Sequence, residues 1–474
     1  MTKPNIVETI RRETAALADR TALIEGAASV CYRDLLSAVD RVAERLRAEG
    51  LQPAQRVAFL CQDGIDYVVG SLAVLSVRAV VVPISPSLMG DEIAAILDRM
   101  DAHFLWSEGE TPDAKPVEIF SRTLFLARRA ARDTLPAEYA AMNPAFVRFS
   151  SGTTGDSKGV LLSHEAILAR TAAADKGLRV QPEDVVVWVL SMSFHFVVTI
   201  LLFLRRGATI VICDSSSFPQ SLLDTLGRQR PTLLYASPFH YHVLAHSAAV
   251  RPEALAGVRL AVSTAMKLSP EIAARFAEKF GRLLCEAYGI IEVGLPFIAE
   301  AGAGHKDGSV GKALPDYEVR IFKADRGGVG EIGIRGPGMF EAYVSPWQPR
   351  PQALRDGWFM TGDVGRLDAD GSLFIVGRTK NVINFAGMKI FPYEVEEVLC
   401  RHPAVGEALV YGIPHPQYGQ LPAAKIVRRD PAAPLDVQDL RRFCYARLSP
   451  YKVPKEFVPV AALDRTASGK PRRG

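Results

Sequence analysis

The chain has 474 residues, of which 48% are hydrophobic and 23% are charged. These fractions are ordinary for a globular protein and exclude a mainly disordered chain, a collagen and a coiled coil. The formal net charge of +4 is too small to favour nucleic acid as a partner.

Short apolar strands alternate with helices over the first 150 residues. Val39, Val42 and Leu46 recur at the spacing of one helix face, and Gly50 ends this predicted helix. The elements predicted next are a strand at 56–60, a helix at 66–77, a strand at 79–83 and a helix at 91–100. This alternation predicts a largely parallel sheet that helices cover on both faces.

The alternation continues through a strand at 258–262 and a helix at 270–280, but the pattern changes near residue 310. Short strands with Gly-rich turns between them then predict a small antiparallel region. These strands are expected at 319–322, 330–335 and 372–376.

Strand-like and helical pieces return after Arg378, including 392–399 and 437–448. We therefore expect an α/β fold with two domains. The large N-terminal domain, residues 1–379, would combine mainly parallel sheets covered by helices with a small β-rich subdomain. The small C-terminal domain, residues 380–474, would be α+β.

The six cysteines lie far apart and form no CxxC pair, so neither a zinc knuckle nor a thioredoxin-like motif is predicted. Because the N-terminus has no apolar signal segment, scattered thiols fit a reducing cytoplasm. The most apolar window, 185–204, contains His195. It falls short of the charge-free span of about 20 residues that a membrane helix needs, so no membrane span is expected.

One segment, residues 150–159, reads Ser-Ser-Gly-Thr-Thr-Gly-Asp-Ser-Lys-Gly. Glycines let backbone N–H groups turn inward, and hydroxyls and a lysine add donors, which suits a loop that binds polyphosphate. The Walker A pattern is absent, and a flexible Ser/Gly segment is the alternative. Apolar runs at 145–147 and 160–162 predict a loop between two strands.

This segment resembles the signature loop of the adenylate-forming superfamily: acyl- and aryl-CoA synthetases, adenylation domains of peptide synthetases, and luciferases. Five further motifs of that superfamily follow in its order and cover nearly the whole chain. They are Tyr288-Gly-Ile-Ile-Glu292, Gly330-Glu-Ile-Gly-Ile-Arg-Gly-Pro337, Trp358-Phe-Met-Thr-Gly-Asp363, Gly377-Arg-Thr-Lys-Asn-Val-Ile383 with Gly387-Met-Lys-Ile-Phe-Pro392, and Arg465-Thr-Ala-Ser-Gly-Lys470.

The resemblance implies an AMP-forming ligase with a two-step reaction. A carboxylate attacks the α-phosphate of ATP, giving an acyl-adenylate and pyrophosphate, and a thiol then takes the acyl group as AMP leaves. Because two anions must meet, the protein must supply positive potential and fixed donors. The implied partners are a small carboxylic acid, ATP with Mg²⁺, and CoA or a carrier-protein phosphopantetheine arm.

The resemblance also implies catalytic roles. Lys470 would offset the charge that develops on the α-phosphate. Glu292 and Thr154 would hold Mg²⁺, and His195 would lie beside the carboxylate pocket.

The implied nucleotide site includes Tyr288 and Gly289 at the adenine. Asp363 and Arg378 would lie at the ribose, whose vicinal diol suits the two acceptor oxygens of a carboxylate. The loop residues assigned to the phosphates are Ser150, Ser151, Gly152, Thr153, Gly155 and Lys158.

The superfamily further implies that the small domain is mobile and presents one face for each half-reaction. Lys380 occupies the hinge position, where an exposed charged residue is compatible with a change in backbone angles. Gly387 matches the glycine at the thiol tunnel, where the missing side chain permits close approach.

The sequence departs from the superfamily pattern at several positions. Ile291 replaces the usual Thr of the YGxTE motif, so a hydroxyl that would touch phosphate is lost. Ser157 replaces Pro, Asn384 replaces a frequent Lys, and residues 262–268 match the SGGAPL motif poorly. An atypical substrate and a non-catalytic nucleotide- or acyl-binding homologue are therefore alternatives.

The segment from Trp188 to Val198 aligns with the substrate-side motif and contains no acid. Amino-acid-activating members place an Asp there, whereas His195 matches the His of acyl- and aryl-CoA synthetases. The apolar neighbours of His195 predict an uncharged apolar acid, either aryl or medium-chain fatty. CoA is the expected thiol, and the alternative is a ligase that loads a carrier protein.

Overall fold

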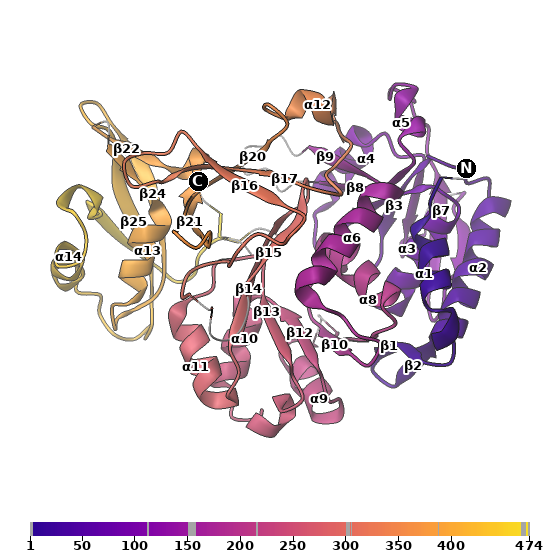
Figure 1. The fold of residues 1–474 in the computed structure, drawn as a ribbon, viewed down its shortest axis with the longest axis horizontal. Coiled ribbons are helices and arrows are strands. Elements are labelled where there is room, and N and C mark those ends of the chain that lie inside the picture. Colours follow the sequence, from indigo (N-terminus) through magenta and orange to yellow (C-terminus); the bar gives the residue numbers. More distant parts are fainter. Residues whose placement is uncertain are drawn as a thin grey trace. The chain divides into compact units, whose positions relative to one another are not determined.

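The computed structural model describes residues 3–110, 113–149, 158–214, 217–299, 304, 306–386, 388–465 and 471–472 (Figure 1). The chain forms two compact units. The first comprises Met1–Glu318 and Arg335–Phe359, and the second comprises Val319–Ile334 and Met360–Gly474. Helices and strands are mixed throughout the chain, which confirms the predicted α/β fold class.

An eight-stranded sheet in the first unit has the order β15-β14-β13-β12-β10-β11-β1-β2. Its centre, from β14 to β1, is parallel, and β15 and β2 add antiparallel edges. The strands are β1 (Thr21–Glu25), β2 (Ala28–Cys31), β10 (Val185–Trp188), β11 (Thr209–Ile212), β12 (Leu233–Ala236), β13 (Leu260–Ser263), β14 (Leu284–Ile290) and β15 (Gly294–Ile298).

A nine-stranded sheet in the same unit has the order β19-β18-β9-β8-β4-β3-β5-β7-β6. Strands β8, β4, β3 and β5 pair in parallel, and the flanking pairs are antiparallel. The strands are β3 (Arg56–Leu60), β4 (Val80–Ile84), β5 (Phe104–Ser107), β6 (Lys115–Glu118), β7 (Thr123–Arg128), β8 (Pro144–Phe149), β9 (Gly159–Ser163), β18 (Ala342–Val344) and β19 (Trp347–Pro349).

Helices link and cover these strands, and two of them begin after a residue whose side chain accepts hydrogen bonds from backbone N–H groups of the first turn. The Asn5 side chain accepts from the N–H groups of Val7 and Glu8, and Ser163 Oγ accepts from Ala166. The helices of this unit are α1 (Ile6–Glu13), α2 (Tyr32–Ala48), α3 (Ile65–Ser76), α4 (Gly90–Arg99), α5 (Glu138–Ala141), α6 (His164–Leu178), α7 (Met192–His195), α8 (Leu201–Arg205), α9 (Gln220–Arg228), α10 (Pro238–His246), α11 (Pro270–Phe280) and α12 (Arg350–Ala353).

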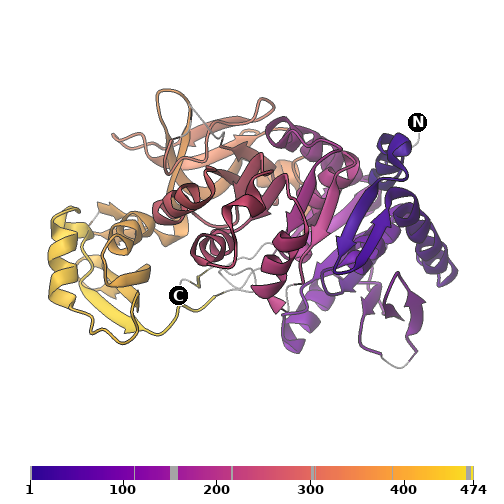
Figure 2. The same cartoon turned by 90° about the horizontal axis from the view of Figure 1, so that it is seen from below.

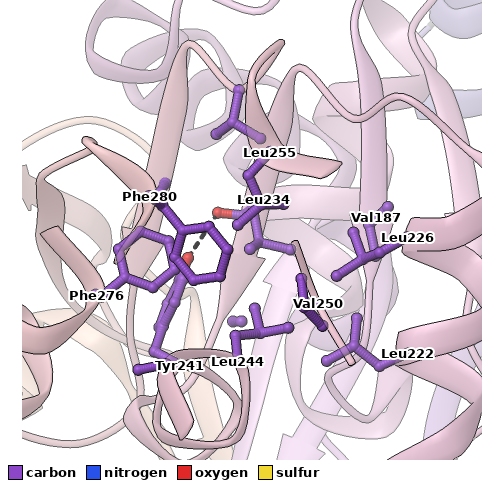
Figure 3. Close-up of a cluster of buried hydrophobic side chains, with 14 of the residues drawn as sticks. Val187, Leu222, Leu226, Leu234, Tyr241, Leu244, Val250, Leu255, Phe276 and Phe280 are labelled. Carbon is purple, nitrogen blue, oxygen red and sulfur yellow. Dashed lines mark hydrogen bonds between the residues drawn. The ribbon is translucent and has the colours of Figure 1, made fainter. Parts of the chain in front are cut away.

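A buried hydrophobic cluster joins α9, α10 and α11 to the neighbouring strands β10, β12 and β13 (Figure 3). Phe276 and Tyr241 meet edge to face with their ring centroids 5.2 Å apart. The Tyr241 hydroxyl lies 2.9 Å from the carbonyl oxygens of Leu234 and Val262, so its proton is donated to neighbouring strands. This cluster holds strands β10, β12 and β13 against helices α9, α10 and α11.

The second unit contains two sheets. Its four-stranded sheet has the order β16-β17-β20-β21, with β16 (Glu318–Phe322), β17 (Gly330–Arg335), β20 (Phe359–Leu367) and β21 (Leu373–Arg378). Its five-stranded sheet is formed by β22 (Ile383–Phe385), β23 (Met388–Ile390), β24 (Val405–His415), β25 (Gly419–Arg428) and β26 (Glu456–Val460). Helices α13 (Pro392–Cys400) and α14 (Val437–Tyr445) pack on this sheet through a separate buried core (Figure 2).

Most predicted elements are present within a residue or two of their expected ends. The strand at 56–60 and the helix at 270–280 have the predicted bounds. The segment 437–448 is helical only to Tyr445, and the strand predicted at 258–262 lies at Leu260–Ser263. In the described part of the chain, no helix is long and apolar enough to cross a membrane.

Candidate active site

The loop predicted to bind phosphate lies between two paired strands. Strands β8 and β9 are antiparallel, and Phe149 pairs with Gly159 across the loop, which confirms the predicted strand on each side. Lys158 is the described residue at the loop's end. Several predicted site residues lie outside the described residues, namely Ser150, Ser151, Gly152, Thr153, Thr154, Gly155, Gly387 and Lys470.

Lys158 is linked to Glu292 through an aromatic ring. Its Nζ lies 4.5 Å from the ring centroid of Tyr343 on β18, a favourable cation–π distance. The Tyr343 hydroxyl donates to Glu292 Oε1 at 3.3 Å. Burial and the nearby Glu292 carboxylate raise the pKa of Tyr343, so its hydroxyl remains a neutral donor. The structure thus brings together two residues that are 134 positions apart (292 − 158).

Glu292 lies in the turn between β14 and β15, and burial raises its pKa. The charges of Arg148 and Arg170 act in the opposite direction. Arg170, on α6, donates to the Ile291 carbonyl and to the Gly338 carbonyl, each at 2.9 Å. These two bonds hold the turn in place.

The donor set fits magnesium. Mg²⁺ is usually held by one or two carboxylates together with substrate phosphates, rather than by a cage of protein ligands. Glu292 provides a half-buried carboxylate, and the described residues contain no cluster of three His, Cys, Asp or Glu side chains that would form a separate metal site. Glu292 would therefore hold the ion with substrate oxygens.

The Tyr288–Gly289 pair lies on β14, opposite β15. The Tyr288 ring is half-buried, and its centroid lies 6.0 Å from that of Phe297. A side chain at Gly289 would have its Cβ 2.5 Å from the Gly294 carbonyl oxygen, so the backbone there tolerates only glycine. Tyr288 thus lies on a strand that closely approaches β15.

His195 ends α7, directly after β10 and its connecting residues. Its half-buried ring lies 6.4 Å from that of Trp188, centroid to centroid. The Trp188 ring is stacked on Tyr235 at 5.8 Å and meets Phe203 edge to face. The ring beside His195 is therefore aromatic and packs on two further aromatic rings.

The histidines of α10 lie beside other side chains of this helix and of its N-terminal cap. His240 Nδ1 lies 2.7 Å from Ser237 Oγ at the start of the helix, and burial lowers the pKa of His240 to about 4. The rings of His242 and His246 lie 4.1 Å apart.

Asp363 and Arg378 pair within the second unit. They face each other in the β20–β21 register, and Arg378 Nε donates to Asp363 Oδ1 at 2.7 Å. Asp363 is buried, and its backbone N–H donates to Thr361 Oγ1. Lys380 follows in the exposed turn Thr379–Asn381, where burial of its amine and the charge of Arg378 lower its pKa.

Sequence reasoning missed Tyr343 and Arg170, which connect the predicted residues. Neither belongs to a motif, and each acts on residues distant in sequence. The one signal in the sequence was the positive charge of Arg170 in an otherwise apolar stretch of α6. In the structure this side chain is fully buried.

Comparison with known proteins identifies the family of this chain. The family model described as AMP-binding enzyme matches residues 10–344, and that of the AMP-binding enzyme C-terminal domain matches residues 394–470. The chain belongs to the AMP-binding enzyme family. The predicted resemblance to adenylate-forming enzymes is confirmed, and so is the predicted class, an AMP-forming acid–thiol ligase of the acyl-CoA synthetase type.

Two relatives and one solved structure show the breadth of this family. The 3-hydroxybenzoate–CoA ligase of Aromatoleum sp. (strain CIB) is 29% identical over 96% of this chain and 92% of its own length. The oxalate–CoA ligase of Arabidopsis thaliana is 29% identical over 96% of this chain and 94% of its own. The ATP-bound structure of MatB from Rhodopseudomonas palustris superposes with a TM-score of 0.84 at 25% identity, covering 99% of this chain and 97% of that one.

Proposed function

We propose that this AMP-binding enzyme activates an apolar carboxylic acid, aryl or medium-chain fatty, and transfers the acyl group to CoA. The observation that carries the proposal is the aromatic ring beside His195: the Trp188 ring lies 6.4 Å from that of His195 and itself packs on Tyr235 and Phe203. Since the segment 188–198 offers no carboxylate, an ammonium group on the substrate would have no partner there.

The proposed adenylation step depends on lowering repulsion between two anions. Lys158 and Lys470 supply positive charge for the phosphates, and the glycines and hydroxyls of the 150–155 segment supply donors. Mg²⁺, when bound, neutralises phosphate charge, and Glu292 with Thr154 would hold it. Tyr343 keeps the Glu292 carboxylate oriented by its hydrogen bond.

In this proposal, separate groups hold the adenine and the ribose. Tyr288 and Gly289 contact adenine, and Asp363 accepts from the ribose hydroxyls while its bond to Arg378 fixes the carboxylate. Residues 380–474 act as a mobile lid that turns at Lys380, bringing Lys470 for the first half-reaction and Gly387 for the second.

We place the enzyme in the cytoplasm, because its six cysteines are all free thiols.

The test is acid-dependent exchange of pyrophosphate into ATP, measured without thiol. The acids are benzoate, 3-hydroxybenzoate, cinnamate, decanoate, oxalate and a set of amino acids. We expect exchange with an aryl or aliphatic monocarboxylate. Exchange only with amino acids or oxalate would contradict the proposed acid, and ATP binding without any exchange would favour the non-catalytic alternative.

The acceptor is tested on the best acid of that panel. We expect thioester formation with CoA, and EDTA should abolish adenylation and therefore any thioester formation that starts from ATP. A rate with a phosphopantetheine-bearing carrier protein that exceeds the rate with CoA would instead identify a carrier-loading ligase.

A further inference from the structure

The helical turn α7, which carries His195, is held at both ends by ionisable side chains from other elements. At its first residue, the Met192 N–H donates to Asp63 Oδ1 at 3.0 Å. Near its last residue, the Arg148 guanidinium donates to the Phe194 carbonyl. Asp63 lies between β3 and α3, and Arg148 lies on β8. Two segments of the nine-stranded sheet therefore fix a turn that follows a strand of the eight-stranded sheet.

This turn needs external support. Four residues are too few for a helix that is stable by itself, because nucleation fixes several residues for one hydrogen bond. The π-helical turn Phe196–Ile200 follows directly, and such turns interrupt the regular hydrogen-bond ladder. The Thr199 hydroxyl donates to the His195 carbonyl. The backbone that carries His195 is thus held by side chains around the turn.

Asp63 is a carboxylate in a place that disfavours charge. Burial raises the pKa of Asp63 to about 7, and the bond from the Met192 N–H lowers it. No cation among the described residues forms an ion pair with Asp63. Its titratable neighbours Cys61 and Tyr67 have pKa values that burial raises, so both are neutral at neutral pH. The Met192 amide is therefore the group that fixes the Asp63 side chain.

Arg148 contacts both the backbone carbonyl and the ring of Phe194, the residue before His195. Its guanidinium donates to the Phe194 carbonyl, and its central carbon lies 5.3 Å from the centre of the Phe194 ring. Burial lowers the pKa of Arg148 to about 10, and Glu292 acts against this, so Arg148 stays charged at neutral pH. A planar guanidinium can make the two contacts together, whereas a lysine ammonium cannot.

We propose that Asp63 and Arg148 are positioning residues that fix the orientation of His195 toward the carboxylate of the acid. This inference rests on the function proposed for His195. The two side chains act through the backbone of Met192 and Phe194 and need not touch substrate. Their effect on rate arises because a catalytic group displaced by a fraction of an ångström loses much of its contribution.

The first experiment measures hydrogen exchange of the backbone amides in peptides covering 190–200 and needs no substrate. Asp63→Leu removes the acceptor, and Arg148→Gln removes the charged donor. We expect both variants to exchange faster in this segment, by about tenfold or more at Met192 in Asp63→Leu. Asp63→Asn keeps an oxygen at the same position, so its exchange should stay near that of the unmodified protein.

Two matched controls separate positioning from general loss of stability. Asp66 is a buried acid on α3 that accepts from the N–H groups of Phe120 and Ser121 instead. Arg56 is a buried arginine on β3 that donates to the Asp101 carbonyl. Asp66→Asn and Arg56→Lys should leave exchange at 190–200 unchanged even where they lower the melting temperature.

The second experiment is a double-mutant cycle on pyrophosphate exchange with 3-hydroxybenzoate. We expect Asp63→Leu and Arg148→Lys, which keeps the positive charge near Glu292 but loses the double contact with Phe194, each to lower kcat about tenfold and to leave the KM for ATP within about twofold. In the His195→Ala background, each change should lower kcat by less than about twofold, because the group being positioned is absent.

The outcomes separate this inference from the function on which it rests. Unchanged amide exchange at 190–200, or full losses of kcat that persist without His195, would overturn the positioning role. If His195→Ala leaves kcat unaltered, or no acid supports exchange, the proposed function is wrong, and amide exchange alone then decides whether Asp63 and Arg148 hold α7.

Discussion

Glu286 and Glu292 are carboxylates near the two ends of β14, and their surroundings differ. Glu292 has Tyr343 as a donor and two arginines nearby. Glu286 accepts from the Leu268 N–H at 3.3 Å, and its burial raises its pKa to about 7 from an ordinary 4.5. The charged form of Glu286 is therefore stabilised less well in the folded protein than in the unfolded chain.

This difference predicts that Glu286→Gln changes the stability of the folded protein in a pH-dependent way. The folded-state pKa is raised, so the cost of burying the carboxylate is absent below the unfolded value of 4.5 and complete above about 7. The cost reaches about 3 kcal/mol at most, at 1.36 kcal/mol per pKa unit. The melting temperature of the variant, relative to the unmodified protein, should rise between pH 5 and pH 8. A difference that is constant over this range would contradict the prediction.

At the residue scale, sequence identified the motif residues but not what connects them. Lys158 and Glu292 belong to recognisable motifs, whereas Tyr343 contacts both from a strand 51 residues beyond Glu292. A tyrosine in a short apolar stretch predicts a core residue and nothing more. Its function follows from a pairing of β18 with β9 that local patterns do not encode.

At the scale of the elements, the hydroxyl of Tyr241 in the buried cluster joins α10 to strands β12 and β13. We expect Tyr241→Phe to lower the free energy of unfolding by about 1–3 kcal/mol, because the carbonyls of Leu234 and Val262 lose a buried hydroxyl donor. Tyr445→Phe on α14 is the control, since that side chain is 49% exposed. Urea unfolding followed by circular dichroism checks both variants, and equal midpoints would contradict the expected contribution.

Elements with a clear apolar period were predicted well, and their ends less well. The helix at 270–280 has Pro270 at its first turn and Gly281 in the left-handed region at its end, so both ends carry local signals. The segment 437–448 has no comparable stop signal at Tyr445, after which Ala446 caps the helix. Strand order was not predicted, because pairs such as β1 with β11 join residues nearly 190 positions apart (210 − 23 = 187).

At the scale of the whole molecule, the proposed lid predicts that two substitutions separate the half-reactions. Lys470→Ala should lower the rate of adenylation by orders of magnitude, because it removes charge at the α-phosphate. Thioester formation from supplied acyl-adenylate should fall far less. Rapid-quench assays of each half-reaction provide the measurement, and equal losses in both would rule out the function proposed for Lys470.

A bulky residue at Gly387, such as Gly387→Leu, is the reciprocal variant. It should slow thioester formation and leave pyrophosphate release unaffected, because the glycine is assigned to the thiol tunnel. Slower pyrophosphate release would count against that assignment.

Arg170 also bears on the order in which the protein forms during synthesis. Its guanidinium binds the Ile291 carbonyl 121 residues later and the Gly338 carbonyl 168 residues later. Gly338 has a φ of +67°, and a Cβ there would lie 2.5 Å from the Ala166 carbonyl oxygen and the Arg170 nitrogen, so only glycine brings its carbonyl this close. Until that glycine has left the ribosome, a buried cation lacks an acceptor and the turn bearing Glu292 lacks its support. Arg170 therefore gains both of its carbonyl acceptors, and the Glu292 turn its complete support, only after more than two thirds of the chain has been made.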